Sequence, residues 1–512
     1  MHGSALAGVV TSVLMVLGGH GAGAAEDIVL FDFESGMFEG WRYEGEKQAE
    51  VFGLEPLQPQ SLGGRDHRKY LGYQGQYVVR TGDTRHDSHP NGKLISKPFT
   101  LDRDYVRFQL GGEVNPFVKV WLEVDGQEVR TAYGNNSYDL KDRSWEVKDL
   151  KGRTACFVIQ DAANMPSLIR VDFIRLSDQP AAPLDGFDER WQETSWVRPG
   201  EWKLAIFHEG HYFDRNTITR GHDGRFHLYT CKIALVDRWK PKEGQIFHYV
   251  ADHVYTGPWQ GGEIVIEKDP GAGEDLVQDP HVVFQDGTYY LYYIGAGKPW
   301  RGWEARPWTQ GPYHLYLATS KDGTHFTRHE KNPLFSDQPF LETPYAKNFG
   351  DTWVMYYGGT DPQSAVAPHG ILYRTSTDLV HWSERRVACL DPKAAGWPEH
   401  LWFRNPIVIE RGVWQDKVFD YYLLTGPVNN DNQSRFHFSG VYRSKSPFHW
   451  DPTTDAEFTE DKLQPKGVFF DGHGGIVRDG GRDHITHCNE YAEGIWIAPL
   501  AWKTPDSRET SK

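Results

Sequence analysis

Short segments in which apolar and polar residues alternate run through most of the chain, and turn residues separate them. In the first third, the clearest such segments are residues 105–110, 118–124, 155–160 and 169–176. A period of two is that of a strand with one buried face, and almost no stretch has the 3.6-residue period of a helix. Residues 26–180 are therefore predicted to form a β-sandwich.

A Pro- and Ala-rich segment, Gln179-Pro180-Ala181-Ala182-Pro183, marks a change of composition. We take residues 181–200 as a linker and residues 201–504 as a second domain. Residues 505–512 are expected to be a disordered tail.

The second domain contains a repeated strand signature, in which a turn ending in Gly precedes an aromatic-rich strand. The signature begins near residues 223, 286, 350, 417 and 481, a spacing of 63 to 67 residues. A second motif with Ser at its start follows at residues 320–326, 376–382 and 444–450. Strand repeats of this kind indicate a β-propeller, since one blade cannot bury both faces alone. The prediction is an all-β chain, an N-terminal β-sandwich followed by a five-bladed β-propeller.

Acidic residues stand before the signature in three successive repeats. Asp214, Asp279 and Glu342 lie seven to nine positions ahead of the turn, whereas Asp223 and Asp286 belong to the turns themselves. The innermost strand of each blade runs along the central channel, so these three carboxylates are predicted to converge at one mouth. Converging carboxylates raise at least one pKa, which suits a general acid. Glycoside hydrolysis needs one such acid and one carboxylate as base or nucleophile.

At these residues, the chain resembles the five-bladed propeller glycosidases, above all glycoside hydrolase family 43, with related families 32, 62, 68 and 117. The resemblance covers about residues 200–503. It implies that Asp214 is the base, Asp279 the residue that orients and tunes, and Glu342 the acid. The segments Glu342-Thr343-Pro344-Tyr345 and Asp279-Pro280-His281-Val282 match well, but Asp214 is followed by Arg215 where the family usually has Pro. The Trp-Met-Asn-Asp-Pro-Asn-Gly type of motif expected for family 32 is missing.

The N-terminal module resembles the levanase-like sandwich of family 32 proteins. The resemblance rests on segments such as Phe31-Asp32-Phe33-Glu34 and Val171-Asp172-Phe173-Ile174. It implies a carbohydrate-active context, with sugar binding and a purely structural role both open for this module.

The fourth and fifth repeats offer further candidates for substrate binding: Arg404, Asn405 and His473. Arg404 could hold a carboxylate or a substrate hydroxyl, or form a structural salt bridge. The family resemblance places His473 near a bound calcium or a water cluster, and a hydrogen-bonded histidine in a Gly-rich turn is the alternative. No cofactor is expected to be required, no metal ligand is firmly assigned, and a structural calcium is compatible with this pattern.

Trp300, Trp303 and Trp308 occupy one polar loop of the second repeat. They are interpreted as a wall on which sugar rings stack, the alternative being a loop folded over the propeller's side. Residues 429–438 are a weaker candidate for the rim of the site.

Charge and composition narrow the partners and the location. A net charge of -15 argues against a nucleic-acid partner, and no segment of the sequence resembles a basic stripe. Residues 1–25 combine an apolar run with small residues before a cleavage site, which predicts a signal peptide and a secreted or periplasmic protein. No later segment predicts a membrane span. Four scattered cysteines contain no C-x-x-C pair and could be disulfides or free thiols.

The sequence thus predicts a secreted glycoside hydrolase that cleaves an oligo- or polysaccharide by carboxylate acid/base chemistry, with inversion implied by the family 43 resemblance. A family 32- or 117-like enzyme on fructose or anhydrogalactose units is one alternative. A non-catalytic carbohydrate-binding propeller is the other.

Overall fold

The structure is a computed structural model of the whole chain. It describes residues 26–45, 51–56, 74–82, 91–135, 137–163, 167–182, 197–234, 245–296, 313–336, 341–360, 369–389, 401–410, 413–414, 417–418, 421–429, 440–444, 446–450, 474–488 and 493–502. None of its helices is long and apolar enough to cross a membrane, within these residues.

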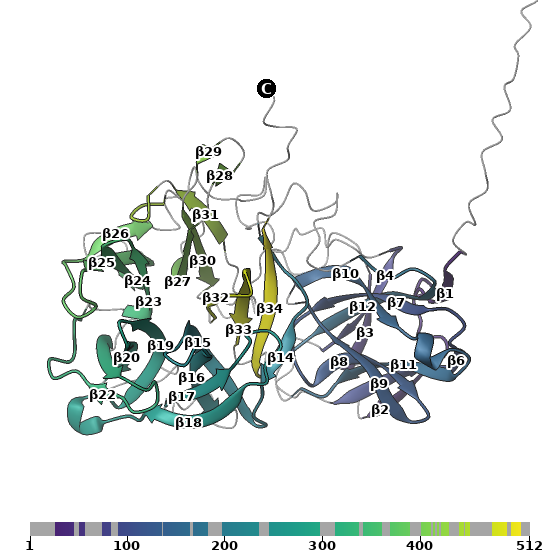
Figure 1. Ribbon diagram of the computed structural model, residues 1–512. Helices are drawn as coiled ribbons and strands as arrows, with labels where there is room; N and C mark the ends of the chain where they lie inside the picture. Colours follow the sequence, from purple (N-terminus) through teal and green to yellow (C-terminus); the bar gives the residue numbers. More distant parts are fainter. Residues whose placement is uncertain are drawn as a thin grey trace, which may run out of the picture.

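The N-terminal domain consists of two antiparallel sheets packed face to face (Figure 1). One sheet has the order β10-β7-β12-β4-β3, with β1 also paired to β12, and the other has the order β2-β5-β11-β8-β9, with β6 also paired to β11. The strands are β1 (Ile28–Phe31), β2 (Trp41–Gly45), β3 (Phe52–Pro56), β4 (Tyr77–Thr81), β5 (Gly92–Ser96), β6 (Phe99–Thr100), β7 (Tyr105–Gly112), β8 (Val118–Val124), β9 (Gln127–Tyr133), β10 (Ser137–Glu146), β11 (Thr154–Asp161) and β12 (Ile169–Ser177). A 3-10 helix, η1 (Lys148–Leu150), follows β10.

The alternating segments of the sequence are the strands that face the sandwich core. Phe108 on β7 and Phe157 on β11 are fully buried, one from each sheet. Their ring centroids lie 5.2 Å apart, and Trp145 of β10 packs 4.4 Å from Phe108. Burial of such rings supplies most of the stability of a small sheet sandwich. The four strands predicted from the period-two pattern are confirmed.

Three described carboxyl groups are buried in this domain, those of Glu113, Asp161 and Asp172. Burial raises the pKa of Asp161 to about 7, and burial likewise raises the pKa of Asp172 to about 7. Asp172 accepts backbone N–H bonds from Gln74 (2.9 Å) and Phe173 (2.7 Å), and Asp161 accepts one from Ala163 (3.4 Å). Burial outweighs these bonds in its effect on both pKa values, so ionisation of Asp161 and Asp172 costs stability near neutral pH.

Asp161→Asn is expected to stabilise the sandwich at pH 8 and to have little effect near pH 4. The folded pKa of Asp161, about 7, lies above the ordinary value of 3.8, so the folded state holds this proton more tightly and loses stability as pH rises from about 4 to 7. Removing the charge should recover up to about 4 kcal/mol. The check is the urea midpoint of sandwich unfolding in both proteins from pH 4 to 8. A difference between them that does not grow with pH would contradict this account.

The second domain places small antiparallel sheets around a central axis (Figure 1). Apart from one two-stranded hairpin, its described strands fall into five such sheets, called here the first to fifth propeller sheets. In the first four sheets, the first strand in the sequence lies nearest the axis and the later strands follow outward in order. They are β15 (His211–Arg220), β16 (Phe226–Ala234), β17 (Ile246–Ala251) and β18 (Gln260–Ile266); β19 (Leu276–Gln285), β20 (Thr288–Ala296), β21 (Tyr313–Ser320) and β22 (Thr327–Arg328); β23 (Leu341–Phe349), β24 (Thr352–Thr360), β25 (His369–Ser376) and β26 (Arg386–Cys389); β27 (Leu401–Glu410), β30 (Tyr421–Asn429) and β31 (Gly440–Ser444); and β32 (Ile476–Asp479), β33 (Arg482–His487), β34 (Ile495–Trp502), β13 (Val197–Pro199) and β14 (Lys203–Ile206). A hairpin of β28 (Val413–Trp414) and β29 (Lys417–Val418) and a 3-10 helix, η4 (Pro270–Ala272), complete the described elements.

The all-β class is confirmed, and the number of blades stays a prediction because parts of the chain lie outside the described residues. The fifth sheet joins both ends of the domain, since β13 and β14 pair with β34. Hence β13, at residues 197–199, belongs to this sheet although it falls inside the predicted linker. Pairing the first strands with the last one closes the ring of sheets and removes two open edges.

The repeated strand signature forms a repeated contact between neighbouring sheets. One tyrosine, six positions after the start of the signature, donates its hydroxyl to a backbone carbonyl in the Ser-containing loop of the next sheet. The pairs are Tyr229 to Gly323 (2.8 Å), Tyr292 to Leu379 (2.5 Å) and Tyr356 to Pro447. The side chains of all three tyrosines are fully buried. The two sequence motifs therefore supply the donor and the acceptor of one hydrogen bond between neighbouring sheets. This shared contact explains why the motifs recur together.

The two domains pack against each other through β34. Tyr133 of the sandwich lies edge-on to Trp496, with ring centroids 5.0 Å apart, and Phe117 contacts Phe207 at 5.6 Å. Val114 joins a buried cluster with Trp496 and other residues of the fifth propeller sheet. An apolar contact of this kind favours a fixed arrangement of the domains and gives the sandwich at least a structural role.

Candidate active site

The inner strands of the first four propeller sheets each carry a β-bulge, at a corresponding position near the start of the strand. The pairing register shifts between Asp214 and Asn216 in β15, between Gln278 and His281 in β19, between Glu342 and Tyr345 in β23, and between Arg404 and Ile407 in β27. Bulges re-aim side chains and are common beside active sites. The predicted catalytic residues all lie at these bulges.

Three bulged residues adopt a left-handed backbone although none is glycine. The φ angles are 59° at Arg215, 52° at Asp279 and 53° at Thr343. Such conformations cost about 1–3 kcal/mol each and persist where the surrounding structure enforces them, often at functional sites. Three left-handed residues at equivalent positions of successive strands favour the interpretation that these bulges belong to a functional site.

Asp279 connects the three strands. Its Oδ1 lies 3.2 Å from Nε of Arg215 on β15, and its Oδ2 accepts a hydrogen bond from the backbone N–H of Thr343 on β23 (3.0 Å). The side chain of Asp279 is only 3% exposed and that of Arg215 only 9%. A buried ion pair with a further hydrogen bond holds its members in one geometry. Asp279 therefore fixes the first and third bulges relative to each other.

Arg215 contacts two of the predicted catalytic residues and was not among the candidates predicted from the sequence. It stands where the resembled family usually has proline, and this departure was the available signal. Its guanidinium Nε lies 3.2 Å from Asp279 and 3.9 Å from Oδ1 of Asp214. Arg215 thus places one positive charge between two of the three predicted carboxylates.

Asp214 and Glu342 occupy equivalent positions, each directly before its left-handed residue. The side chain of Asp214 is 20% exposed, and Glu342 is 7% exposed. The sequence placed the three acids nine, seven and eight positions before their turns, and the family resemblance gave Asp279 a separate, orienting role. In the register of the strands, Asp279 matches Arg215 and Thr343, one position later than Asp214 and Glu342. Asp279 is bonded to the side chain of Arg215 and to the backbone of Thr343.

His281 secures the strand on which Glu342 lies. Its Nε2 donates to the carbonyl of Ala346 on β23 (3.1 Å), and its ring packs 4.9 Å from that of Tyr345. Burial lowers the pKa of His281 to about 4, so the ring is neutral at physiological pH. The segment Asp279-Pro280-His281 therefore forms hydrogen bonds to β23 at two residues, Thr343 and Ala346.

A cavity of about 310 Å³ begins at the bulges and runs along the inner strands. Its lining starts in the inner strands at Arg215, Asp279, Thr343 and Pro406, and in the fifth sheet at Gly474. Asp214 and Glu342 come just before the lining residues of their strands and are not themselves part of the lining. Of the three predicted acids, only Asp279 therefore faces this cavity.

The fifth sheet joins the first through a small polar contact. The Thr486 hydroxyl donates to Oδ1 of Asn216 (2.5 Å) and accepts from the backbone N–H of Gly475 (2.7 Å). A Cβ on Gly474 would stand 1.8 Å from the carbonyl oxygen of Thr486, so only glycine fits there. The Gly-rich turn that follows His473 is thus required by close backbone approach.

Several predicted substrate-binding residues are not described by the structure. Trp300, Trp303, Trp308 and His473 lie outside the described residues, as do residues 430–438 of the weaker rim candidate. For Arg404 and Asn405 the structure describes the backbone in β27, where Arg404 is the register equivalent of Glu342, but not the side chains. Their roles stay predictions.

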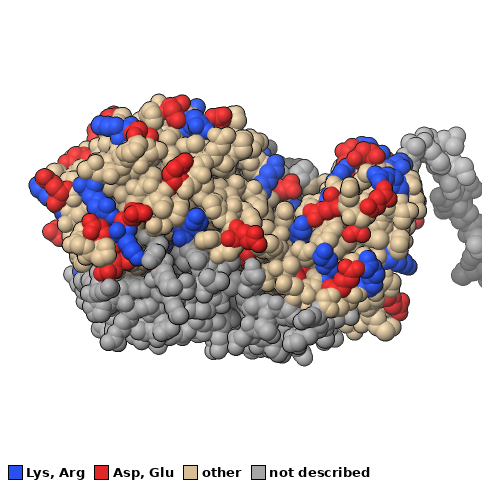
Figure 2. Space-filling view, turned by 90° about the horizontal axis from the view of Figure 1, so that it is seen from below, with Lys and Arg blue, Asp and Glu red and all other residues tan. Residues whose placement is uncertain are grey.

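Charged side chains of both signs are interspersed on the face drawn in Figure 2, and its described residues form no continuous basic stripe. Among the described cysteines, Cys156, Cys231 and Cys488 form no disulfide. The described part of the chain has one group of three residues able to hold a metal ion together, at the turn between β15 and β16 and not at the bulges.

A search of family models found none that matches the chain. The chain is similar to the protein ecdE of Aspergillus rugulosus, which carries a provisional glycosyl hydrolase name, at 29% identity over 208 residues. The match covers 39% of this chain and 27% of the Aspergillus protein, so it spans about a quarter of that relative's length.

Three of the solved structures that the chain is similar to are named as sugar-cleaving enzymes. The GH32 β-fructofuranosidase BmSUC1 of Bombyx mori matches with a TM-score of 0.42 and 16% identity, over 61% of this chain and 64% of that one. The RS223 β-xylosidase matches with a TM-score of 0.42 and 15% identity, over 59% and 96%. An α-L-arabinanase of Cellvibrio cellulosa, solved with arabinohexaose, matches with a TM-score of 0.41 and 14% identity, over 60% and 98%.

Proposed function

We propose that this protein is a glycoside hydrolase whose reaction takes place at the bulges of β15, β19 and β23. The observation that carries the proposal is the pairing of Asp214 and Glu342 at equivalent, left-handed bulges that Asp279 connects. The similarity to a protein with a glycosyl hydrolase name supports it. Hydrolysis of a glycosidic bond needs two carboxyl groups held on opposite sides of the bond, and these strands can supply them.

The proposed roles follow from the surroundings of each group. Glu342 is the less exposed of the two and acts as the acid that protonates the leaving oxygen. Asp214, whose Oδ1 lies 3.9 Å from Nε of Arg215, is assigned the role of the base that activates water. Asp279 and Arg215 are positioning residues, since their buried ion pair holds the strands of the other two.

The proposed reaction is inverting, and the proposed substrate is an oligo- or polysaccharide with furanoside or pyranoside links. Fructose and anhydrogalactose units are alternative substrates, and a binding propeller without activity is the alternative function. We also propose that residues 1–25 direct export and that a structural calcium near His473 is compatible with the fold.

The stereochemical part is tested by proton NMR of the first anomer released from any glycoside that the enzyme cleaves. An inverting enzyme releases the opposite anomer before mutarotation. Release of the same anomer would contradict inversion and would indicate that Asp214 acts as nucleophile. Binding of sugar without any release would contradict hydrolysis itself and favour the binding propeller.

A further inference from the structure

The turn between β15 and β16 gathers three metal-ligating side chains at the opposite end of β15 from Asp214. His222, Asp223 and His227 each offer one ligand atom, and these atoms lie within 4.8 Å of one another. His222 and Asp223 are exposed in the turn, and His227 is buried on the first residues of β16. Two imidazoles and one carboxylate are a donor set that Zn²⁺ binds well.

Neighbouring residues hold the ligands in place. Nδ1 of His227 bonds to Nε2 of His248 on β17 (2.9 Å), which leaves Nε2 of His227 facing Asp223 at 3.0 Å. Oδ1 of Asp223 also accepts the backbone N–H of Arg225 (3.0 Å). Metal-bound histidines commonly bond through the second ring nitrogen to an outer partner that fixes their orientation. His248 has that relation to His227.

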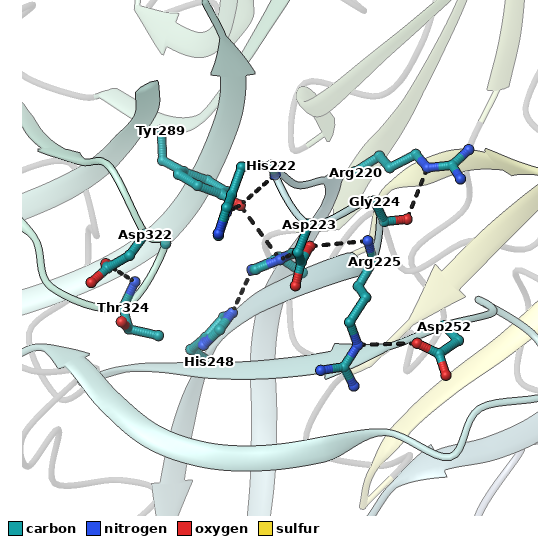
Figure 3. A network of polar contacts seen from close by, with 12 residues as sticks. Arg220, His222, Asp223, Gly224, Arg225, His248, Asp252, Tyr289, Asp322 and Thr324 are labelled. Carbon is teal, nitrogen blue, oxygen red and sulfur yellow. Dashed lines mark hydrogen bonds and ion pairs between the residues drawn. The ribbon is translucent and has the colours of Figure 1, made fainter. Parts of the chain in front are cut away.

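The cationic side chains of the turn are directed away from the carboxylate (Figure 3). Nε of Arg225 pairs with Asp252 at 3.1 Å, and Nε of Arg220 donates to the carbonyl of Gly224 at 3.0 Å. In these two contacts, the guanidinium groups of Arg220 and Arg225 bind groups other than the Asp223 carboxylate. They therefore leave room for a metal cation beside that carboxylate.

The second propeller sheet contributes to the same cluster. The Tyr289 hydroxyl, on β20, lies 2.8 Å from Nδ1 of His222 and accepts the backbone N–H of His222 at 3.0 Å. Figure 3 shows Tyr289 directed at His222. A Cβ added to Gly323 of the same sheet would stand 3.1 Å from Nδ1 of His227, so the two sheets are in close contact here.

We propose that His222, Asp223 and His227 form a Zn²⁺ site, with water completing the coordination on the exposed side. The ion ties the β15–β16 turn to β16 within the first propeller sheet and so stabilises the turn, next to Tyr289 of the second sheet. This site is separate from the bulges, and its existence does not depend on the proposed hydrolase activity.

The test is calorimetric titration of the full, chelator-treated protein with Zn²⁺, with thermal unfolding at the end of the titration. His222→Ala is the test variant, since His222 is exposed and its loss should leave the fold intact. His381→Ala is the matched control, because His381 is an exposed histidine paired with Asp378 through a 2.7 Å contact in the third sheet.

The wild type and His381→Ala are expected to bind one equivalent of Zn²⁺ and to gain about 2–4 °C in Tm at excess metal. His222→Ala is expected to bind at least about tenfold more weakly and to lose this gain. Substituting Co²⁺ should give visible absorption bands in the wild type that are absent from His222→Ala. Equal Zn²⁺ affinity in His222→Ala and the wild type, or no binding by the wild type, would overturn the proposal.

Discussion

Glu342→Gln is expected to lower kcat/KM on natural glycosides by about 10²–10⁴-fold. The amide has nearly the shape of the carboxyl group but cannot give a proton to the leaving oxygen. The loss should be much smaller on aryl glycosides, whose leaving groups need little protonation. The measurement is kcat/KM for both classes of substrate, with circular dichroism and Tm to show that the variant is folded.

Asp286→Asn is the matched control for this prediction. Asp286 lies in the β19–β20 turn with φ of 50°, a conformation that Asn tolerates well, and it is not part of the bulges. Activity close to wild type is expected. An equal fall for both substrate classes in Glu342→Gln would contradict the acid role, because it would point to general damage of the site.

Asp279→Asn is expected to cost about 3–5 kcal/mol of stability, because it removes the nearer and more buried of the two carboxylates beside the Arg215 guanidinium. Arg215→Gln should have a similar cost, since Asp279 then keeps the Thr343 N–H but loses the opposite charge. The double variant should lose clearly less than the sum of the two, because the buried Asp279–Arg215 pair is then removed as a whole. The measurement is the denaturant midpoint of propeller unfolding for all four proteins.

A second readout distinguishes positioning from simple stability. If Asp279 and Arg215 set the electrostatics around Asp214 and Glu342, the pH profile of residual activity should shift in the single variants and return toward wild type in the double variant. Additive stability losses with an unchanged pH profile would mean that the ion pair is independent of the reaction.

The repeated features of the fold could be read from the sequence. Tyr229, Tyr292 and Tyr356 stand out because strand composition and spacing repeat, and in the structure they bind neighbouring sheets in the same way. The alternating segments around Phe108 and Phe157 likewise predict a sandwich, since burial of one face imposes a period of two. Such signals are local, so one chain suffices to find them.

The site was harder to predict in detail. Positions 214, 279 and 342 could be found by counting back from a turn, but the bulges carry no glycine that would mark a left-handed residue. Counting back from the turns therefore did not show that Asp279 stands one register position later than the other two acids. Arg215 shows its role only through a contact across two sheets, a distance of 64 residues along the chain.

The zinc-binding cluster was outside the reach of the sequence for the same reason. Asp223 is a plain turn residue by its position, and His227 is one polar residue of an aromatic strand. Only the packing of β17 beside β16 brings His248 to His227 and fixes the ring.

The central claim is that the bulges of β15, β19 and β23 form a hydrolytic site. Its most direct test is reducing-sugar release from arabinan, xylan, fructan, galactan and agaro-oligosaccharides by the wild type and by Glu342→Gln side by side. The account predicts release from at least one of these substrates by the wild type and loss of that release in the variant. Release that survives the substitution would contradict the assignment of the site, and sugar binding without release by either protein would contradict the hydrolase.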